Sequence, residues 1–363
     1  MRIIYGVSGE GSGHSSRARA MASHLRDQGH EVRIVSYDRG YRTLHTHFES
    51  LEISGLHIIS SDNKVSMPRT VFTNLRRLPE FRRSVRRLKQ LFDEFHPDIV
   101  ITDFEPMTAY LARSRKLPLI SLDNQHRMRY MHYDSPPRLR LDRWVTEMVI
   151  RLMVPTPDVA LASTFFQGKV KNDRTFLFPP ILRAEMGELT PVSGEHHLVY
   201  VTSGYDTLID VLKRFADERF VIYGYNREAV DGNLQYREFS TEGFLADLAG
   251  CRSVIATAGF TLISEAMYLQ KPYLAFPMHG QFEQQLNGLC LEELGYGMNA
   301  RAADYPTLNG FLDSVPRFAD ALQHYADGFS NNPQACQNLA IRERLDTLLA
   351  NEGAVLREFH QRR

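Results

Sequence analysis

A strand–helix–strand–helix pattern runs through residues 253–288, which read SVIATAGFTLISEAMYLQKPYLAFPMHGQFEQQLNG. Ser253–Thr257 and Pro272–Phe276 are short, apolar, β-rich runs, and a turn residue follows each of them, Gly259 after the first and Pro277 after the second. Each turn leads into a segment that we predict to be helical. Strands that alternate with helices of about ten or more residues pair in parallel. This pattern therefore predicts part of a doubly wound α/β sheet.

The same alternation extends through both halves of the chain. The other predicted strands are Arg2–Val7, Glu31–Ser36, Asp98–Thr102, Leu117–Leu122, His197–Thr202 and Phe220–Tyr223. A helix is predicted over Ser16–Gln28, where Gly29 supplies a left-handed C-cap. The two series of strands predict two Rossmann-like domains, each built on a doubly wound parallel sheet.

Composition indicates where one domain ends and the next begins. Residues 178–195 are rich in proline, glycine and polar residues, which is typical of a linker. We expect an N-terminal domain at residues 1–180, a linker at 181–195, a C-terminal domain at 196–335 and a helical tail at 336–363 that returns toward the N-terminal domain. Because ligands of open parallel sheets bind beyond the carboxyl ends of the strands, we expect both sets of strand-end loops to face a cleft between the domains.

The overall composition is that of a globular protein. The chain has 363 residues, 43% of them hydrophobic and 24% charged, and its 43 Lys and Arg residues balance 43 Asp and Glu residues. These values exclude a disordered chain, a fibre and a disulfide scaffold. We find neither a run of about 18 apolar residues that would cross a bilayer nor the apolar core of a signal peptide near the N-terminus. Three widely spaced cysteines, Cys251, Cys290 and Cys336, are expected to be reduced thiols in a cytoplasmic protein.

The two halves of the chain carry opposite charge. Residues 1–180 contain 28 Lys and Arg against 19 Asp and Glu, a net charge of +9, and residues 181–363 therefore carry −9. This asymmetry indicates two domains with different partners. No motif for recognising nucleic acid accompanies the basic half, so we expect no nucleic-acid partner.

A glycine-rich turn, Gly9-Glu-Gly-Ser-Gly13, follows the first predicted strand and opens the first predicted helix. Glycines at this point let backbone amides approach an anionic or polyhydroxylated ligand. The turn does not fit a dinucleotide site, because the Gly-x-Gly-x-x-Gly fingerprint counted from Gly9 requires glycine where this chain has His14. We expect Gly11 and Gly13 to border the site of an acceptor substrate.

His14 is the first candidate for a general base, because imidazole titrates near neutrality and can take a proton from a hydroxyl. Asp103 follows a predicted apolar strand, where its carboxylate could hold the imidazole in its useful tautomer. Each residue also has a structural alternative, since His14 could cap its helix or simply be solvated, and Asp103 could cap the next helix. His126, which follows another predicted strand, is a second candidate base.

The turn at Gly259 has the features of a diphosphate site. The backbone amides of Gly259, Phe260 and Thr261 stand at a predicted helix start, where they are available to phosphate oxygens. Glu265 lies about one turn into that helix and could accept hydrogen bonds from both hydroxyls of a ribose. Three polar residues further along the chain could bind a sugar, namely Glu283, Gln284 and Asn287.

Together these motifs resemble the donor site of GT-B glycosyltransferases. The donor motif is matched by Gly-x-x-x-x-x-Glu-Ala, Lys-Pro, Pro and Glu-Gln-x-x-Asn in that order, and Gly-x-Gly-x-Gly-His is similar to the first loop of that superfamily. The branches that the chain most resembles are the UDP-glycosyltransferases and the bacterial enzyme that adds N-acetylglucosamine to the lipid-linked peptidoglycan precursor. The resemblance implies that His14 is the base on the acceptor hydroxyl, with Asp103 as its partner.

The resemblance also implies roles for the residues of the donor motif. Glu265 would bind the donor ribose, and Gly259 with its neighbours would bind the diphosphate. Glu283 and Gln284 would bind hydroxyls of the sugar.

Two positions depart from the pattern of the family. Thr257 stands where many relatives have a phosphate-binding histidine, and Leu262 stands where they have serine. Phosphate contacts would then rely on backbone amides and on the hydroxyls of Thr257, Thr261 or Ser203.

The donor motif also indicates the course of the reaction. Retaining GT-B enzymes commonly carry Glu-x7-Glu ending at the glutamate matched by Glu265, but here Thr257 occupies the position of the first acid. No Asp-x-Asp occurs in the sequence, which counts against a metal-bridged diphosphate. We therefore expect an inverting, metal-independent transfer with no cofactor besides the nucleotide-sugar donor, in which helix amides stabilise the leaving diphosphate.

Residues 69–90 form a basic stretch with eight positive charges and one acid, Glu80. Helical spacing of its apolar residues predicts a basic amphipathic helix, interrupted near Pro79, with a core stripe of Phe72, Leu75, Leu78, Phe81, Val85 and Leu88. Three interpretations stay open: a solvated cationic face, a dock for anionic lipid headgroups, or an acceptor site formed by Arg82, Arg83 and Arg86. A second basic cluster at residues 127–151 contains Trp144 and is expected to extend the same surface.

The sequence thus predicts an enzyme that moves a sugar from a nucleotide diphosphate donor, UDP first, to a hydroxyl acceptor in a cell-envelope glycolipid or polysaccharide. The acceptor could be anionic or lipid-linked, and the protein could contact the inner face of the membrane. The alternatives are a nucleotide-sugar epimerase or hydrolase on the same fold and a non-catalytic protein that binds sugar nucleotides.

Overall fold

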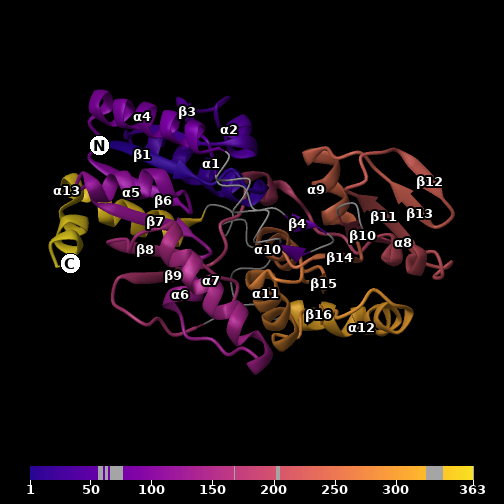
Figure 1. Cartoon of the computed structure of the whole chain (residues 1–363). Helices are drawn as coiled ribbons and strands as arrows, with labels where there is room; N and C mark the ends of the chain where they lie inside the picture. The colour runs from indigo at the N-terminus through magenta and orange to yellow at the C-terminus, as the bar shows by residue number, and fades with distance from the viewer. Residues whose placement is uncertain are drawn as a thin grey trace. The chain divides into compact units, whose positions relative to one another are not determined.

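The computed structural model describes residues 1–55, 60–61, 64–65, 77–166, 168–201, 205–323 and 338–362. The chain forms two compact units (Figure 1). The N-terminal unit comprises Met1–Ser60, Val65–Arg183 and Asn338–Arg363, and the C-terminal unit comprises Ser61–Lys64 and Ala184–Gln337. The main boundary between the units falls after Arg183.

A seven-stranded sheet forms the centre of the N-terminal unit. Its strands, in spatial order, are β3 (Ser50–Glu52), β2 (Glu31–Ser36), β1 (Arg2–Val7), β6 (Ile99–Asp103), β7 (Leu119–Asp123), β8 (Val159–Ser163) and β9 (Thr175–Phe178). Every neighbouring pair is parallel. The chain order reverses between β1 and β6, so the sheet is doubly wound and the predicted fold class is confirmed for this unit.

Helices cover both faces of this sheet. On one face α1 (Ser12–Asp27) and α13 (Leu339–Gln361) share a core with β1, β6, β7 and β8. On the other face α4 (Leu78–Phe95) and α5 (Pro106–Ser114) pack against the sheet. The remaining elements of this part of the chain are α2 (Asp38–Leu44), α6 (His126–Tyr130), the 3-10 turn η1 (Pro137–Leu139), α7 (Arg140–Met153) and the two-residue strands β4 (Ser60–Ser61) and β5 (Lys64–Val65).

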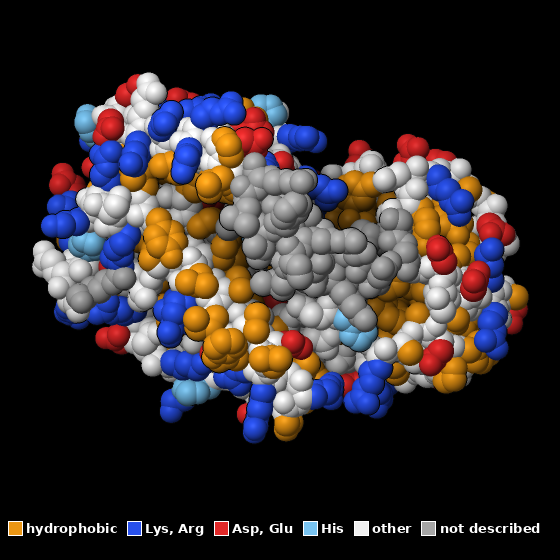
Figure 2. All heavy atoms as spheres, viewed as in Figure 1, with side chains coloured by type: hydrophobic (Ala, Val, Ile, Leu, Met, Phe, Trp, Pro, Cys, Tyr) orange, Lys and Arg blue, Asp and Glu red, His pale blue; other side chains and the backbone are white. Residues whose placement is uncertain are grey.

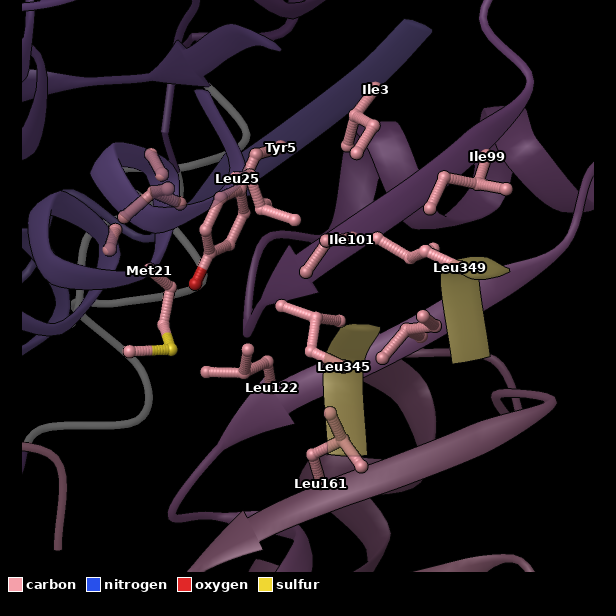
Figure 3. Packing of buried hydrophobic residues seen from close by; sticks show 14 of the residues in the cluster. Ile3, Tyr5, Met21, Leu25, Ile99, Ile101, Leu122, Leu161, Leu345 and Leu349 are labelled. Carbon is pink, nitrogen blue, oxygen red and sulfur yellow. The ribbon is translucent and has the colours of Figure 1, made fainter. Parts of the chain in front are cut away.

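The last helix, α13, completes the core of the N-terminal unit (Figure 3). Leu345 and Leu349 pack among Ile101, Leu122 and Leu161 of the strands, and all five side chains are buried. The backbone leaves helical geometry at residues 350–353, so α13 continues after a kink. Because α13 buries its apolar face on this sheet, the end of the chain belongs to the N-terminal unit.

The C-terminal unit contains a second seven-stranded sheet. Its strands, in spatial order, are β12 (Ala229–Asp231), β13 (Leu234–Tyr236), β11 (Arg219–Tyr223), β10 (His196–Tyr200), β14 (Ser253–Thr257), β15 (Tyr273–Phe276) and β16 (Gly297–Asn299). Only the edge pair β12–β13 is antiparallel among these strands. Its helical elements are η2 (Ala184–Glu188), α8 (Asp206–Leu212), α9 (Thr241–Gly250), α10 (Phe260–Tyr268), α11 (Phe282–Glu293) and α12 (Tyr305–Gln323). The predicted fold class is confirmed for this unit as well.

Most predicted strands agree with the structure. Arg2–Val7, Glu31–Ser36 and Ser253–Thr257 have the predicted bounds, and the other predicted strands shift by about one or two residues at their ends. α1 begins at Ser12, before its predicted start, so the glycine turn runs directly into the helix. The prediction contains the four central strands of each seven-stranded sheet and misses the outer strands β3, β8, β9, β12, β13 and β16. β8, for example, reads Val-Ala-Leu-Ala-Ser, and alanine does not mark a strand.

Helix α4 corrects two parts of the prediction for the basic stretch. Pro79 lies in the first turn of the helix, directly after Leu78. Proline is tolerated at this position, so Pro79 does not interrupt the helix. Leu78 and Val85, expected in the core, are exposed. Leu88 is buried as predicted, and the rest of the buried face consists of Ser84, Phe92 and Phe95, because the helix runs beyond residue 90 and buries the apolar stripe of its second half. Residues 69–76 lie outside the described residues.

Candidate functional site

The N-terminal unit assembles a candidate site at the carboxyl edge of its sheet. β1 and β6 are the adjacent strands at which the winding reverses, and Val7 pairs with Asp103 at their ends. Open α/β sheets bind ligands beyond the strand ends at this kind of position. Because α1 follows β1 after a short turn, His14 in its first turn lies beside the end of β6.

Two glycines are required by the shape of that turn. A Cβ atom on Gly9 would lie 2.0 Å from the carbonyl oxygen of Tyr37, and Gly11 adopts a left-handed φ of 77°. Gly11 is exposed and Gly13 is half-buried. Their contact with an acceptor stays a prediction.

His14 and Asp103 form a hydrogen-bonded pair. His14 Nδ1 lies 2.7 Å from Asp103 Oδ1, and the side chains are 13% and 0% exposed. Since a carboxylate only accepts hydrogen bonds, the Nδ1 of His14 is the donor in this contact. This geometry can hold a general base in its working tautomer.

Asp103 is not the cap of the following helix. Phe104 turns the chain with a left-handed φ of 59°, and Glu105 caps α5 by accepting hydrogen bonds from the amides of Met107 and Thr108. Burial raises the pKa of Glu105. The capping role considered for Asp103 is therefore filled by Glu105, and the Asp103 carboxylate is hydrogen-bonded to His14.

Arg17 joins this pair, although the sequence interpretation missed it. Its Nε donates to Asp103 Oδ2 at 2.8 Å and its Nη2 donates to Asp103 Oδ1 at 2.7 Å, while Nη2 also lies 3.2 Å from His14 Nδ1. The side chain is only 4% exposed. The spacing of three residues between His14 and Arg17, which puts both on one helix face, is the signal that could have found it.

Opposing effects set the charges of this cluster. Burial raises the pKa of Asp103, but the charges of Arg17 and His14 and their hydrogen bonds outweigh it, so the pKa lies below its usual value. Burial lowers the pKa of Arg17, but Asp103 outweighs that effect and the net shift is upward. The cluster therefore contains an ionised carboxylate shared between a guanidinium and the imidazole.

His126, the second candidate base, is fully buried. Its Nδ1 lies 2.7 Å from Asp123 Oδ2, its backbone amide donates to Asp123 Oδ1, and its ring stacks on Tyr130. The ring thus supports the turn after β7. Of the two histidines, only His14 presents part of its side chain to solvent.

The C-terminal unit places a helix start at the corresponding position of its sheet. β10 and β14 are the strands at which the winding reverses, and α10 follows β14 after Ala258 and Gly259. The N-cap residue is Gly259, which has no side chain that could cap the amides of the first turn. The positive end of the helix dipole therefore points out of the carboxyl edge of the sheet at Gly259.

Polar side chains of α11 hold the loops around this helix start. Asn287 is fully buried, and its Nδ2 donates to the carbonyl oxygen of Ala258 at 2.9 Å. Gln284 accepts from the amide of Met278 at 3.0 Å and donates to Gln281 Oε1 at 2.8 Å. Both residues thus shape the loops that follow β14 and β15.

The other predicted donor residues lie at the same edge. Thr257 pairs with Phe276, so the loops after β14 and β15 are neighbours and the two parts of the motif come together. Glu265 is 2% exposed. Of the remaining residues, Phe260 is buried and the partly exposed ones are Thr257, Gly259, Thr261 and Glu283. Ser203 lies outside the described residues.

The arginines predicted for the acceptor lie on α4. Arg82, Arg83, Arg86 and Arg87 are all exposed. Within the described part of the chain no acid forms an ion pair with any of them. Their role stays a prediction.

Three observations apply across the described residues. Among them, no three His, Cys, Asp or Glu side chains gather as a metal ion requires. No helix in those ranges combines the length and apolarity needed to cross a membrane. Cys251 and Cys290 are buried free thiols, and Cys336 lies outside the described residues.

Comparison with known sequences identifies the family. The profile of glycosyl transferase family 1 matches residues 1–316. The chain belongs to this family. As a member of glycosyl transferase family 1 the protein is a glycosyltransferase, which confirms the predicted activity and favours neither the epimerase or hydrolase nor the non-catalytic alternative.

Two similar proteins come from species of Methanosarcina. A protein of Methanosarcina acetivorans is 24% identical over 324 residues, which cover 82% of this chain and 83% of the relative. A protein of Methanosarcina mazei is 24% identical over 331 residues, covering 82% and 85%. Both are described as uncharacterized glycosyltransferases.

Solved structures show which fold this family 1 glycosyltransferase adopts. The glycotransferase of kitacinnamycin aligns with a TM-score of 0.68 at 16% identity over 95% of this chain and 98% of that chain. The calicheamicin glycosyltransferase CalG4 aligns with a TM-score of 0.68 at 13% identity over 97% and 99%. The fold is GT-B, as predicted.

Proposed function

We propose that this glycosyltransferase moves a sugar from a UDP-sugar to a hydroxyl group by an inverting, metal-independent displacement. The observation that carries the proposal is the His14–Asp103–Arg17 cluster at the winding reversal of the N-terminal sheet. It provides an imidazole with a fixed tautomer and a partly exposed ring.

The proposed reaction is a single displacement. His14 Nε2 takes the proton of the acceptor hydroxyl while its oxygen attacks the anomeric carbon. The bond between that carbon and the diphosphate oxygen breaks, and the nucleoside diphosphate leaves with the electron pair. Attack from the face opposite the leaving group inverts the anomeric centre, and the dipole of α10 stabilises the negative charge on the diphosphate.

The donor proposal rests on the loops after β14 and β15. Gly259 would receive the diphosphate, Glu265 the ribose and Glu283 with Gln284 the sugar. Two similar structures, the spinosyn rhamnosyltransferase SpnG and SsfS6 of Streptomyces sp. SF2575, are complexes with thymidine diphosphate, so dTDP is the first competitor of UDP.

A thermal-shift screen tests the donor. UDP-, dTDP-, GDP- and ADP-sugars are compared, because a ligand that binds only the folded state raises its melting temperature, by roughly 5 °C at a hundred times Kd. We expect the largest shift with a UDP-sugar. A larger shift with another base would replace UDP in the proposal, and no shift with any of them would contradict the donor site.

Transfer assays test the chemistry. The anomeric configuration of the product, measured by proton NMR coupling constants, should be opposite to that of the donor. Activity should persist in EDTA, because helix amides take the place of a metal at the diphosphate. Retention of configuration, or loss of activity in EDTA, would contradict the corresponding part of the proposal.

The acceptor is proposed to be an anionic or lipid-linked envelope glycolipid or polysaccharide that meets the basic N-terminal unit at the inner face of the membrane. The support is the +9 charge of residues 1–180 and the exposed, unpaired arginines of α4 within the described chain. Charge reversal at Arg82, Arg83, Arg86 and Arg87 should weaken acceptor binding and leave donor affinity unchanged. Unchanged acceptor binding would contradict this assignment.

A further inference from the structure

Helix α7 turns its apolar side outward. Leu141, Trp144 and Leu152 are 70%, 61% and 63% exposed, and Val145 and Val149 are also exposed. Ile150 is the only residue of the helix that is buried. An amphipathic helix of a globular protein normally packs its apolar stripe into the core, so this stripe requires another explanation.

The exposed stripe continues onto α5 and α4. The hydroxyl of Tyr110 on α5 donates to the carbonyl oxygen of Leu152 at 2.8 Å, so the C-terminal end of α7 meets α5. Between α5 and α4 lies a hollow of about 320 Å³ lined by apolar side chains that include Val85, Met107 and Leu111. We call this surface the α4–α5–α7 face and define it by Leu78, Val85, Tyr110, Leu141, Trp144, Val145, Val149 and Leu152. Figure 2 shows hydrophobic side chains gathered over these helices, with Lys and Arg side chains along their margin.

Positive charge borders the apolar centre. On α4, Leu78, Arg82, Val85 and Lys89 follow one another at spacings of three and four residues, so they form one stripe beside the hollow. On the other side, Arg138, Arg140 and Arg151 are exposed around α7. Among the described residues none of these cations forms an ion pair, whereas Arg143 is paired with Glu147 at 3.0 Å.

We propose that the α4–α5–α7 face docks on the surface of an anionic lipid bilayer. The apolar side chains would enter the boundary between headgroups and acyl chains, Trp144 would lie at that interface, and the bordering cations would contact anionic headgroups. A second copy of the chain fits this face less well, because two such faces would bring uncompensated positive charge together. The basic stretch at residues 69–90 supplies only the α4 part of this face. The apolar stripe of α7 is a separate part of it.

Trp144 is the only tryptophan in the chain, so its fluorescence reports on this face alone. The experiment mixes the full-length protein with phosphatidylcholine vesicles, with or without phosphatidylglycerol. We expect a blue shift and co-sedimentation with the anionic vesicles, quenching by brominated acyl chains, and weaker binding at high salt.

Two variants test the two components of the dock. Leu141→Ser with Leu152→Ser should weaken partitioning about tenfold or more, because two exposed leucines no longer enter the lipid. Arg82→Glu with Lys89→Glu should weaken it by a similar factor at low salt. The matched control is Arg39→Glu with Arg42→Glu, which makes the same charge change on two exposed side chains of α2, outside the α4–α5–α7 face. All the substituted side chains are exposed, so melting temperatures should stay close to that of the wild type.

Several outcomes would overturn the proposal. Absence of both the blue shift and co-sedimentation would do so directly. An emission that is already blue-shifted without lipid would show that Trp144 is covered by protein, and a shift that grows with protein concentration alone would assign the face to self-association. Equal losses of vesicle binding in the Arg82→Glu, Lys89→Glu variant and in the control would show that the overall positive charge, and not this face, binds the vesicles. None of these measurements uses sugar transfer, so their failure is distinguishable from failure of the proposed reaction.

Discussion

His14 and Asp103 lie 89 positions apart in the chain, and they meet because α1, which carries His14, follows β1 after a short turn, while Asp103 ends the adjacent strand β6. Arg17 contacts both oxygens of this carboxylate, because its Nε donates to Oδ2 and its Nη2 donates to Oδ1. A carboxylate that is neutralised by arginine stabilises a neighbouring imidazolium less than a carboxylate alone would. If His14 is the base, as proposed, its reactivity would therefore depend on a residue that need not touch the substrate.

Substitution of His14 tests the base. His14→Ala should lower the transfer rate by about 10²–10⁴-fold, which is the usual contribution of a positioned general base. Nucleotide affinity, measured by calorimetry, should not change. His45→Ala, which removes an exposed histidine from the same unit, is the control and should keep full activity. Full activity of the His14 variant would contradict its role.

Substitution of Arg17 tests its role as a positioning residue. In Arg17→Met the charge of Asp103 acts on His14 alone, so the imidazolium is stabilised and the acidic limb of the kcat/KM profile should move to higher pH. Arg17→Lys keeps the charge without the bidentate fork and should give a smaller shift. A loss of rate with an unmoved acidic limb would indicate a purely structural role.

Asp103 links the same cluster to stability. Asp103→Asn should lower the free energy of unfolding at neutral pH by about 3 kcal/mol, because Arg17 stays buried without its carboxylate. The pKa of Asp103 is depressed in the folded state, so its contribution is complete above the unfolded value of about 3.9 and is lost as the pH falls through the folded value. Urea unfolding of both proteins should therefore show a constant difference above about pH 5 that narrows below about pH 4. A difference that does not depend on pH would contradict this account.

At the scale of elements, the same amphipathic pattern leads to different outcomes in different helices. α13 buries its apolar stripe in the core, α4 buries only the stripe of its second half, and α7 leaves its stripe exposed. Periodicity identifies the stripe, but packing partners from distant parts of the chain decide whether it is buried. α10 differs again, because its function is proposed to reside in its first turn.

Gly259 at the start of α10 allows a test of the proposed diphosphate site. Its φ is −69° and a Cβ atom would meet nothing within 4 Å, so larger residues fit there. Gly259→Asp should cap the helix and stabilise it by a few tenths of a kcal/mol, but its carboxylate would occupy the anion position. We expect binding of UDP, measured by calorimetry, to weaken more than about tenfold, since a carboxylate would repel the diphosphate.

The control for this substitution is Gly259→Ala, which adds the Cβ atom without the charge and should bind UDP almost as the wild type does. Equal affinity of the aspartate and alanine variants would contradict a diphosphate at the start of α10.

At the scale of the whole molecule, the chain leaves the N-terminal unit and returns to it with α13. The stability of that unit therefore depends on residues at the end of the chain, which follow the whole of the C-terminal unit in sequence. The fully buried Leu345 side chain packs against strands that precede it in the chain by more than 180 positions (Figure 3).

Substitution in α13 tests this dependence. Leu345→Ala should lower the unfolding free energy of the N-terminal unit by about 3 kcal/mol, through lost burial and the cavity left behind. Hydrogen-exchange mass spectrometry should show faster exchange in β1, β6 and β7 and unchanged exchange in β14 and β15. Leu339→Ala, on the same helix but 43% exposed, should have little effect. Faster exchange in both units would contradict the assignment of α13 to one of them.

The sequence by itself determines the α/β fold class, the approximate positions of the four central strands of each large sheet and the candidates His14 and Asp103, because strand periodicity, glycine turns and helix starts are local properties. It does not determine the role of Arg17, the burial of His126 or the outward face of α7. Each of these depends on which side chains from distant strands and helices become neighbours. Burial, ion pairing and hydrogen bonding are set by those neighbours, so they cannot be derived from the local sequence.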